Sequence, residues 1–295
     1  MVRGGLRSIQ DNRGVTLIEL MIALVISAIL VGGTYSIFIT QQRTYVLQDQ
    51  VVGVQQDGRA ALTIMARDIR MAGMLTGDEF SVNGASEAIT PTNSNAGPDQ
   101  IRVVYAAEEV SVVSSVDTVN KQVTLASGAD RFNTSTRRYL AFEGQDHVYQ
   151  VSNRDIGTNT LTLTESPPSY LADFSARVYC VNAITYDVSG NALRRNDGSG
   201  AQDLAGVANQ SVVEDLQFAY QVEGDTSNWF NTPADAGATN DDIRAVRINL
   251  LVSTAVEDTQ DQSYHRPALE DRAGSGTQDG FRRRVYTTVV KLRNR

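Results

Sequence analysis

The N-terminal part of the chain is an almost uninterrupted apolar run. Between Val15 and Ile39 the only charged side chain is that of Glu19. A helix of about 24 residues, rising about 1.5 Å per residue, covers roughly 36 Å, which is enough to cross a bilayer. We therefore expect residues 15–39 to form a transmembrane helix behind a short polar leader, residues 1–14. A carboxylate inside such a helix costs about 2.5 kcal/mol or more at mid-depth, so Glu19 needs a specific role.

From residue 40 onward the apolar residues recur at helical spacing instead of forming a run. This spacing predicts that residues 40–74 are the amphipathic second half of the same helix, ending near Gly73 or Gly77. Its apolar stripe is expected to lie against a sheet and contains Tyr45, Val52, Leu62, Met65, Ile69 and Ala72. We expect the charged residues between them, Asp68 included, to occupy other faces.

After residue 75 the pattern changes to short alternating runs that are typical of strands, and residues 75–295 are expected to form the body. The three clearest runs surround Leu216–Val222, Val246–Val252 and Tyr286–Leu292. Residues 81–99, 223–242 and 255–280 are polar and read as loops. We therefore predict an α+β fold, with one long helix packed on an antiparallel sheet and a β-rich insertion at roughly 76–210.

Charge is spread unevenly along the chain. The net charge is −8, yet the first 14 residues carry +2 and the last 15 carry +6, so the rest carries −16. An acidic body argues against a general nucleic-acid surface, and we expect no nucleic acid as a partner. The single cysteine, Cys180, cannot form an intrachain disulfide, and its apolar neighbours predict a buried free thiol.

No arrangement of catalytic residues stands out. The two histidines, His147 and His265, are far apart in the sequence and have no neighbouring nucleophile or metal-ligand spacing. Acidic residues cluster around Asp241 and Asp258, but neither cluster has the spacing of an EF-hand loop. We expect no enzyme activity, no cofactor and no metal, and we interpret the acidic loops as solvated.

The segment that begins the apolar run, Arg13-Gly14-Val15-Thr16-Leu17-Ile18-Glu19-Leu20, resembles the cleavage and methylation motif of prepilins. This motif occurs in type IV pilins and in the pseudopilins of type II secretion. The resemblance implies that a membrane peptidase cuts the leader after Gly14 and that the new N-terminal residue, Val15, is N-methylated. Val15 is itself a departure, because the family usually has Phe there.

The same resemblance gives Glu19 a role in assembly. Cleavage creates a positive amino group on Val15, and a carboxylate partner offsets part of the cost of burying it among apolar helices. We expect Glu19 to pair with that amine, on a neighbouring subunit or on its own chain. The arginines of the leader favour a cytoplasmic N-terminus and a periplasmic body in the inner membrane, followed by incorporation into a pilus at the cell surface.

Three further segments resemble PilW-type minor pilins. They are the helix end from Ala66 to Gly73, the segment Val213-Glu214-Asp215-Leu216 and the C-terminal strand that ends in Leu292-Arg293-Asn294. The resemblance implies a minor pilin that, with other minor pilins and the major pilin, primes pilus assembly for twitching motility and adhesion. Its expected partners also include the prepilin peptidase and methyltransferase and a large tip adhesin. Two alternatives stay open, a J-type minor pseudopilin of type II secretion and a pilus-borne subunit that binds DNA or a surface.

Overall fold

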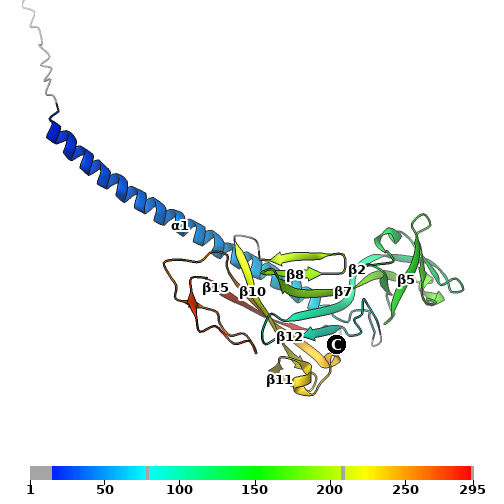
Figure 1. Cartoon of the computed structure of the whole chain (residues 1–295). Helices are drawn as coiled ribbons and strands as arrows, with labels where there is room; N and C mark the ends of the chain where they lie inside the picture. The colour runs from blue at the N-terminus through cyan, green and yellow to red at the C-terminus, as the bar shows by residue number, and fades with distance from the viewer. Residues whose placement is uncertain (1–14, 78–79, 207–209, 294–295) are drawn as a thin grey trace, which may run out of the picture. The chain divides into compact units, whose positions relative to one another are not determined.

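The long N-terminal helix dominates the computed structural model, which describes residues 15–77, 80–206 and 210–293. Helix α1 runs without interruption over Leu17–Arg70 (Figure 1). The chain forms two compact units, of which one ends at Gln48 and the other begins at Asp49. Helix α1 contributes to both units, and each is described by itself. The fold is α+β, as predicted.

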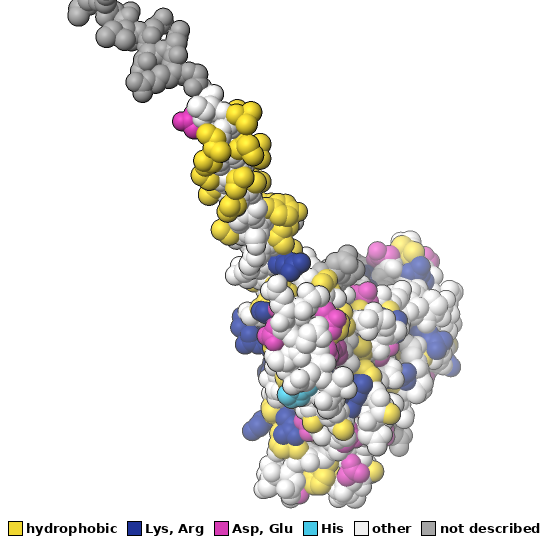
Figure 2. All heavy atoms as spheres, turned by 60° about the vertical axis from the view of Figure 1, so that its left-hand side comes forward, with side chains coloured by type: hydrophobic (Ala, Val, Ile, Leu, Met, Phe, Trp, Pro, Cys, Tyr) yellow, Lys and Arg dark blue, Asp and Glu magenta, His cyan; other side chains and the backbone are white. Residues whose placement is uncertain are grey.

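From residue 15 on, where the structure describes it, the first unit is a single helix whose apolar side chains are exposed. Leu17, Ile22, Leu30 and Phe38 are all more than half exposed, and Figure 2 shows hydrophobic side chains gathered on this part of the chain. By length and composition α1 is long and apolar enough to cross a membrane. An apolar surface of this extent is stable only in apolar surroundings.

In the second unit α1 buries one face. Met65 and Ile69 on α1, and Ala72 just after its end, are fully buried, as predicted from the apolar stripe. The prediction was wrong at the N-terminal end of the stripe, because Tyr45 and Val52 are exposed. It was also incomplete: Val54 and Ala61, spaced seven residues apart, continue the buried face.

A four-stranded antiparallel sheet forms one wall of this core, in the order β11-β10-β12-β15. Its strands are β10 (Ser211–Val222), β11 (Asp225–Phe230), β12 (Ile243–Thr254) and β15 (Arg283–Lys291). The three clearest strands of the sequence are therefore confirmed. The loop predicted at 223–242 was wrong in part, because β11 forms a hairpin with β10 there. The loop predicted at 255–280 holds a two-stranded ladder of β13 (Tyr264–His265) and β14 (Gln278–Asp279).

The insertion forms a second, nine-stranded sheet that closes on itself. Two long strands, β2 (Gln100–Asp117) and β7 (Arg177–Ser189), pair with each other and with different partners at each end. At one end they join a ring in the order β2-β3-β6-β5-β4-β7, which is a closed six-stranded antiparallel barrel. The other strands of this ring are β3 (Gln122–Leu125), β4 (Tyr139–Phe142), β5 (Val148–Asp155) and β6 (Thr160–Leu163). Closure removes free edges that could pair with other chains.

At their other end β2 and β7 form an open part of this sheet, which we call the extended sheet (Figure 1). It is completed by β1 (Ile89–Thr92), β8 (Ala192–Asn196) and β9 (Ala201–Ala205). The loop predicted at 81–99 was therefore wrong where β1 lies. Short 3-10 helices connect the strands at Ala129–Arg131, Ser169–Ala172, Pro233–Ala236 and Asn240–Asp242.

Three clusters of buried side chains, counted over the described residues, fill these layers. The largest joins the second part of α1 to the four-stranded sheet and to one face of the extended sheet. A second cluster fills the barrel and includes Cys180, so the prediction of a buried free thiol is confirmed. Burial raises the pKa of this thiol. The third cluster covers the opposite face of the extended sheet.

Asp99 connects the insertion to the four-stranded sheet. This buried carboxylate accepts hydrogen bonds from the backbone N–H groups of Ser94 (2.7 Å) and Phe218 (2.9 Å). Burial raises its pKa from 3.8 to about 6, although both hydrogen bonds lower it; the negative charges of Asp271 and Asp215 raise it further. In the folded protein Asp99 therefore takes up a proton at a higher pH than in the unfolded chain.

This difference predicts a pH dependence of stability. Below about pH 6 the folded state binds one proton more than the unfolded state, so the contribution of Asp99 grows as the pH falls from 7 to 4. A shift of about two pKa units corresponds to about 3 kcal/mol. As the pH falls from 7 to 4, the unfolding free energy of the wild type should therefore increase relative to that of Asp99→Asn by up to about 3 kcal/mol. Chemical denaturation of both proteins in detergent at several pH values measures it.

A matched variant checks the sign. Asp117 accepts hydrogen bonds from Asn120 and Val119 in an exposed turn, and these lower its pKa. The unfolding free energy of the wild type should therefore decrease relative to that of Asp117→Asn as the pH falls. An Asp99→Asn difference that stays constant from pH 7 to pH 4 would contradict the assignment.

Gly58 allows α1 and β15 to approach closely. A Cβ atom on Gly58 would lie 2.4 Å from Cε2 of the Tyr286 ring. The ring is held in place because its hydroxyl donates a hydrogen bond to the carbonyl oxygen of Val54 at 3.1 Å. The aromatic ring thus lies directly on the helix backbone, at a position where any larger residue would displace it.

Substitution of this glycine should destabilise the protein. Gly58→Ala is expected to lower the unfolding free energy by about 1–3 kcal/mol, the usual cost of forcing extra volume into a packed core. Gly53→Ala is the control, because the nearest atom to its Cβ, Cβ of Gln210, lies 3.5 Å away. There the gain in helix propensity, up to about 1 kcal/mol, should dominate. Thermal melts that rank the two variants the other way round would refute the close approach.

Candidate functional site: the N-terminal motif and the anchor of α1

Thr16 and Glu19 form a capping box at the start of α1. The Thr16 hydroxyl accepts a hydrogen bond from the Glu19 N–H (3.3 Å), and Oε2 of Glu19 accepts one from the Thr16 N–H (2.9 Å). The Thr16 hydroxyl also donates to Oε2, at 2.8 Å. This reciprocal arrangement satisfies backbone N–H groups that a helix start otherwise leaves without partners. The carboxylate of Glu19 is therefore held at the first turn by its own chain.

Val15 immediately precedes this capping residue. It is exposed and lies outside the helix. Gly14, on the other side of the expected cleavage site, lies outside the described residues, as does the rest of the leader, 1–14. If the chain is cut between them, the new amino group stands one residue before Thr16 and next to the turn that holds the Glu19 carboxylate.

A second carboxylate, Asp68, anchors the other end of α1. Its side chain is buried, so the expectation that it lies on a face other than the buried one was wrong. It accepts hydrogen bonds from the hydroxyls of Tyr105 (2.7 Å) and Tyr186 (2.6 Å) and from Nε of Arg195 (3.0 Å). These three donors come from β2, β7 and β8, so one helical side chain is attached to three neighbouring strands of the extended sheet.

The protonation states suit this role. Burial, together with the negative charge of Asp68, raises the pKa of both Tyr105 and Tyr186. Both hydroxyls therefore keep their protons at physiological pH and remain donors. Because the guanidinium of Arg195 supplies the opposite charge, the carboxylate is neither unpaired nor short of hydrogen bonds.

The acidic loops use their carboxylates for local structure. Asp235 and Asp242 each complete a capping box, accepting the N–H of Thr232 (2.9 Å) and Thr239 (2.8 Å). Asp258 pairs with Arg282 at 2.9 Å. Within the described ranges, no three His, Cys, Asp or Glu side chains gather as a metal site would require.

Comparisons with known proteins address both ends of the chain. Residues 9–35 match the family model described as the prokaryotic N-terminal methylation motif. Residues 178–294 match the model described as type IV pilus-assembly protein W. Among solved structures, the type IV-like pilin TTHA1219 from Thermus thermophilus is 15% identical and aligns over 84% of this chain and 97% of its own, with a TM-score of 0.39. No curated protein matches the chain.

The N-terminal match lies on a helix with an exposed apolar half, so the start of this α+β chain is similar to that of a prepilin. The C-terminal match covers β7 to the end of β15 and identifies this part as PilW-like. The resemblance to PilW-type minor pilins is therefore confirmed: the chain is similar to prepilins over residues 9–35 and to the type IV pilus-assembly protein W over residues 178–294.

Two residues of this site were missed in the sequence. The role of Thr16 was visible in principle, because Thr-x-x-Glu before an apolar run is the signature of a capping box. Asp68 gave no such signal, since its three partners lie 37 to 127 residues further along the chain. Its position inside the segment that resembles PilW, residues 66–73, was the only indication.

Removal of the Asp68 charge should loosen α1 from the extended sheet. Asp68→Asn leaves the Arg195 guanidinium without its buried partner, and we expect a loss of about 3 kcal/mol in unfolding free energy. Asp187→Asn is the control, because its pair with Arg194 (2.6 Å) is partly exposed and worth about 1 kcal/mol or less. Chemical denaturation of the full chain in detergent compares them. Equal losses of unfolding free energy in the two variants would show that the Asp68–Arg195 pair contributes no more than a surface ion pair.

Proposed function

We propose that this protein is a minor subunit of a type IV pilus. The peptidase cuts between Gly14 and Val15, Val15 is N-methylated, and residues 15–39 hold the protein in the inner membrane with its body in the periplasm. From there it joins other minor pilins and the major pilin in a complex that primes pilus growth and so serves twitching motility and adhesion. It acts as a structural subunit and catalyses no reaction.

The observation that carries this proposal is that the N-terminal half of α1 is apolar and exposed and directly follows a prepilin-type motif. Leu17, Leu24 and Leu30 are more than 60% exposed, which is stable in lipid or among the apolar helices of neighbouring subunits. A permanent membrane anchor stays in lipid, whereas the helix of a pilin lies first in lipid and then among the helices of neighbouring subunits. The match of residues 9–35 to the methylation motif supports a pilin.

Glu19 has two separable roles on this proposal. Its capping box with Thr16 stabilises the start of α1, and its charge offsets the amine of Val15 in the filament. Glutamine can also serve at this position of a capping box, but it carries no charge. Comparison of Gln and Ala at position 19 therefore distinguishes the two roles.

Both Glu19→Gln and Glu19→Ala should be cleaved normally and remain in the membrane fraction. Both should be depleted from sheared filaments by about tenfold or more, because loss of the charge pair removes at least about 1.4 kcal/mol of interaction free energy. Mass spectrometry of the mature N-terminus reports cleavage at Gly14 and methylation of Val15. Immunoblots of filament and membrane fractions report incorporation.

The control is Thr16→Val, which removes the hydroxyl of the capping box and keeps the charge. It should be incorporated at near wild-type level. Normal incorporation of Glu19→Gln would refute the charge pairing, and depletion of Thr16→Val alone would show that helix capping is what assembly requires. A mature N-terminus other than Val15 would overturn the proposal as a whole.

A further inference from the structure

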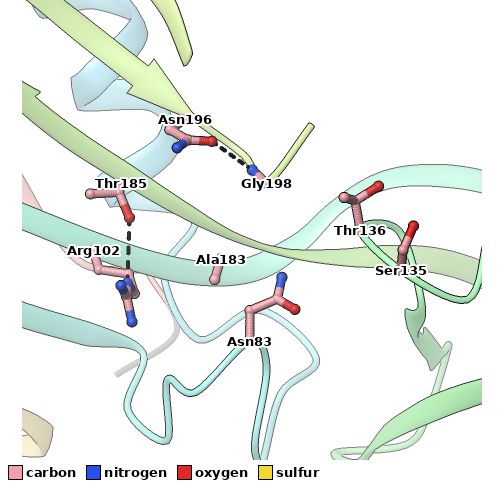
Figure 3. A pocket seen from close by; sticks show the side chains of 8 residues that line it. All are labelled: Asn83, Arg102, Ser135, Thr136, Ala183, Thr185, Asn196 and Gly198. Carbon is pink, nitrogen blue, oxygen red and sulfur yellow. Dashed lines mark hydrogen bonds between the residues drawn. The ribbon is translucent and has the colours of Figure 1, made fainter. Parts of the chain in front are cut away.

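A polar pocket lies on the extended sheet, on the face turned away from α1. Arg102 on β2, Thr185 on β7 and Asn196 on β8 are cross-strand neighbours and form its floor together with Ala183 (Figure 3). Their sequence neighbours Val103 and Ile184 point to the other side and are buried with α1. The cavity has a volume of about 230 Å³. This is below the roughly 300 Å³ at which pockets for drug-sized ligands begin, so it suits a small molecule.

Two tight loops form the opposite wall. Asn83 and Gly84 form a two-residue turn in which both have positive φ (51° and 81°), closed by paired hydrogen bonds between Val82 and Ala85. Ser135 and Thr136 lie in a loop that the side chain of Asn133 holds by accepting three consecutive N–H groups. The polar groups of this wall are therefore preorganised by local turns.

Gly198 lines the pocket in a backbone conformation that favours glycine. Its φ is 90°, and its N–H donates to Oδ1 of Asn196 at 2.9 Å. A Cβ atom at this position would stand 3.7 Å from the Asn83 amide nitrogen and 4.0 Å from the Thr136 carbonyl oxygen, on the pocket side of the turn. Because Oδ1 of Asn196 is occupied by Gly198, its NH₂ group is the part left to face a ligand.

Among the described residues that line the pocket, only Arg102 is charged, and its guanidinium has no carboxylate partner in the described parts of the chain. Nε of Arg102 donates to the Thr185 hydroxyl at 3.3 Å, and no carboxylate of the described residues forms an ion pair with it. The neighbouring arginines of β8 differ, since Arg194 pairs with Asp187 (2.6 Å) and Arg195 with Asp68 (3.0 Å). In a body rich in acidic residues, a partly buried arginine left unpaired among amide and hydroxyl groups is an anion-binding feature.

We infer that this pocket binds a small hydroxylated carboxylate, chemically a uronic-acid unit of a glycan. The Arg102 fork matches one carboxylate with two parallel N–H donors. The amides of Asn83 and Asn196 and the hydroxyls of Thr136 and Thr185 match the ring hydroxyls of a sugar, which both donate and accept. Orthophosphate has no such hydroxyl set, and its second negative charge would meet no second cation in the lining.

Ligand-observed NMR titration of the full chain in detergent tests this, with glucuronate as the probe and with glucose and inorganic phosphate as comparisons. Glucuronate should bind saturably, and glucose and phosphate more weakly. Arg102→Gln should weaken glucuronate binding by about tenfold or more, as expected for loss of a charge-assisted hydrogen bond. Arg59→Gln is the control, because it removes the same charge from an exposed position on α1 and should leave binding unchanged.

A second variant keeps the test decisive if Arg102→Gln fails to fold. Asn196→Asp retains the oxygen that accepts the Gly198 N–H, so the turn survives, but it places a negative charge beside the ligand carboxylate. It should abolish glucuronate binding. Absence of saturable binding by the wild type, equal binding of glucose or phosphate, or unchanged binding by both variants would each overturn the inference. Because binding is measured on the purified protein, these outcomes are independent of filament incorporation.

Discussion

Asp68 brings a carboxylate into the interface between α1 and the extended sheet, where it must be fully paired to be tolerated. Two tyrosine hydroxyls and one guanidinium satisfy it, and each comes from a different strand. An apolar stripe alone would allow a helix to rotate or slide by a fraction of a turn on a sheet. A buried carboxylate with three directional partners does not, because a small displacement leaves a charge without its hydrogen bonds. The register of the helix on the insertion therefore depends on this one contact.

The insertion can act as a platform because β2 and β7 are long enough to belong to two structures. One end of each strand closes the barrel, and the other end forms the extended sheet, whose two faces differ. One face carries Ile101, Val103 and Ile184 against α1, and the other carries Arg102 and Thr185 in the polar pocket. This follows from the alternation of side chains along a strand. The strands that hold the helix in place therefore also hold the pocket in shape.

The sequence predicted the elements whose signal is local. The apolar run and the alternating strands around Phe218, Ile248 and Val290 were recognised because periodicity is a property of consecutive residues. Closure of the barrel could not be predicted, since it depends on pairing between β2 and β7, whose partners lie 65 to 85 residues apart. Strand β11 was missed because Asp225, Ser227 and Asn228 are polar, as an edge strand beside solvent permits. The pocket could not be predicted for the same reason as the barrel, because its lining comes from five separate segments.

At the start of α1, the interpretation of Glu19 from the sequence was incomplete. Glu19 was interpreted only through an amine that exists after cleavage, yet its carboxylate already has partners in Thr16. A carboxylate at the end of an apolar helix is costly while it is unpaired, and the two hydrogen bonds that it accepts from Thr16 reduce that cost. On the proposed function, the subunit can therefore wait in the membrane with Glu19 satisfied by its own chain. The new amine of Val15 then appears beside a carboxylate that is already oriented, so pairing requires little further ordering of the side chain.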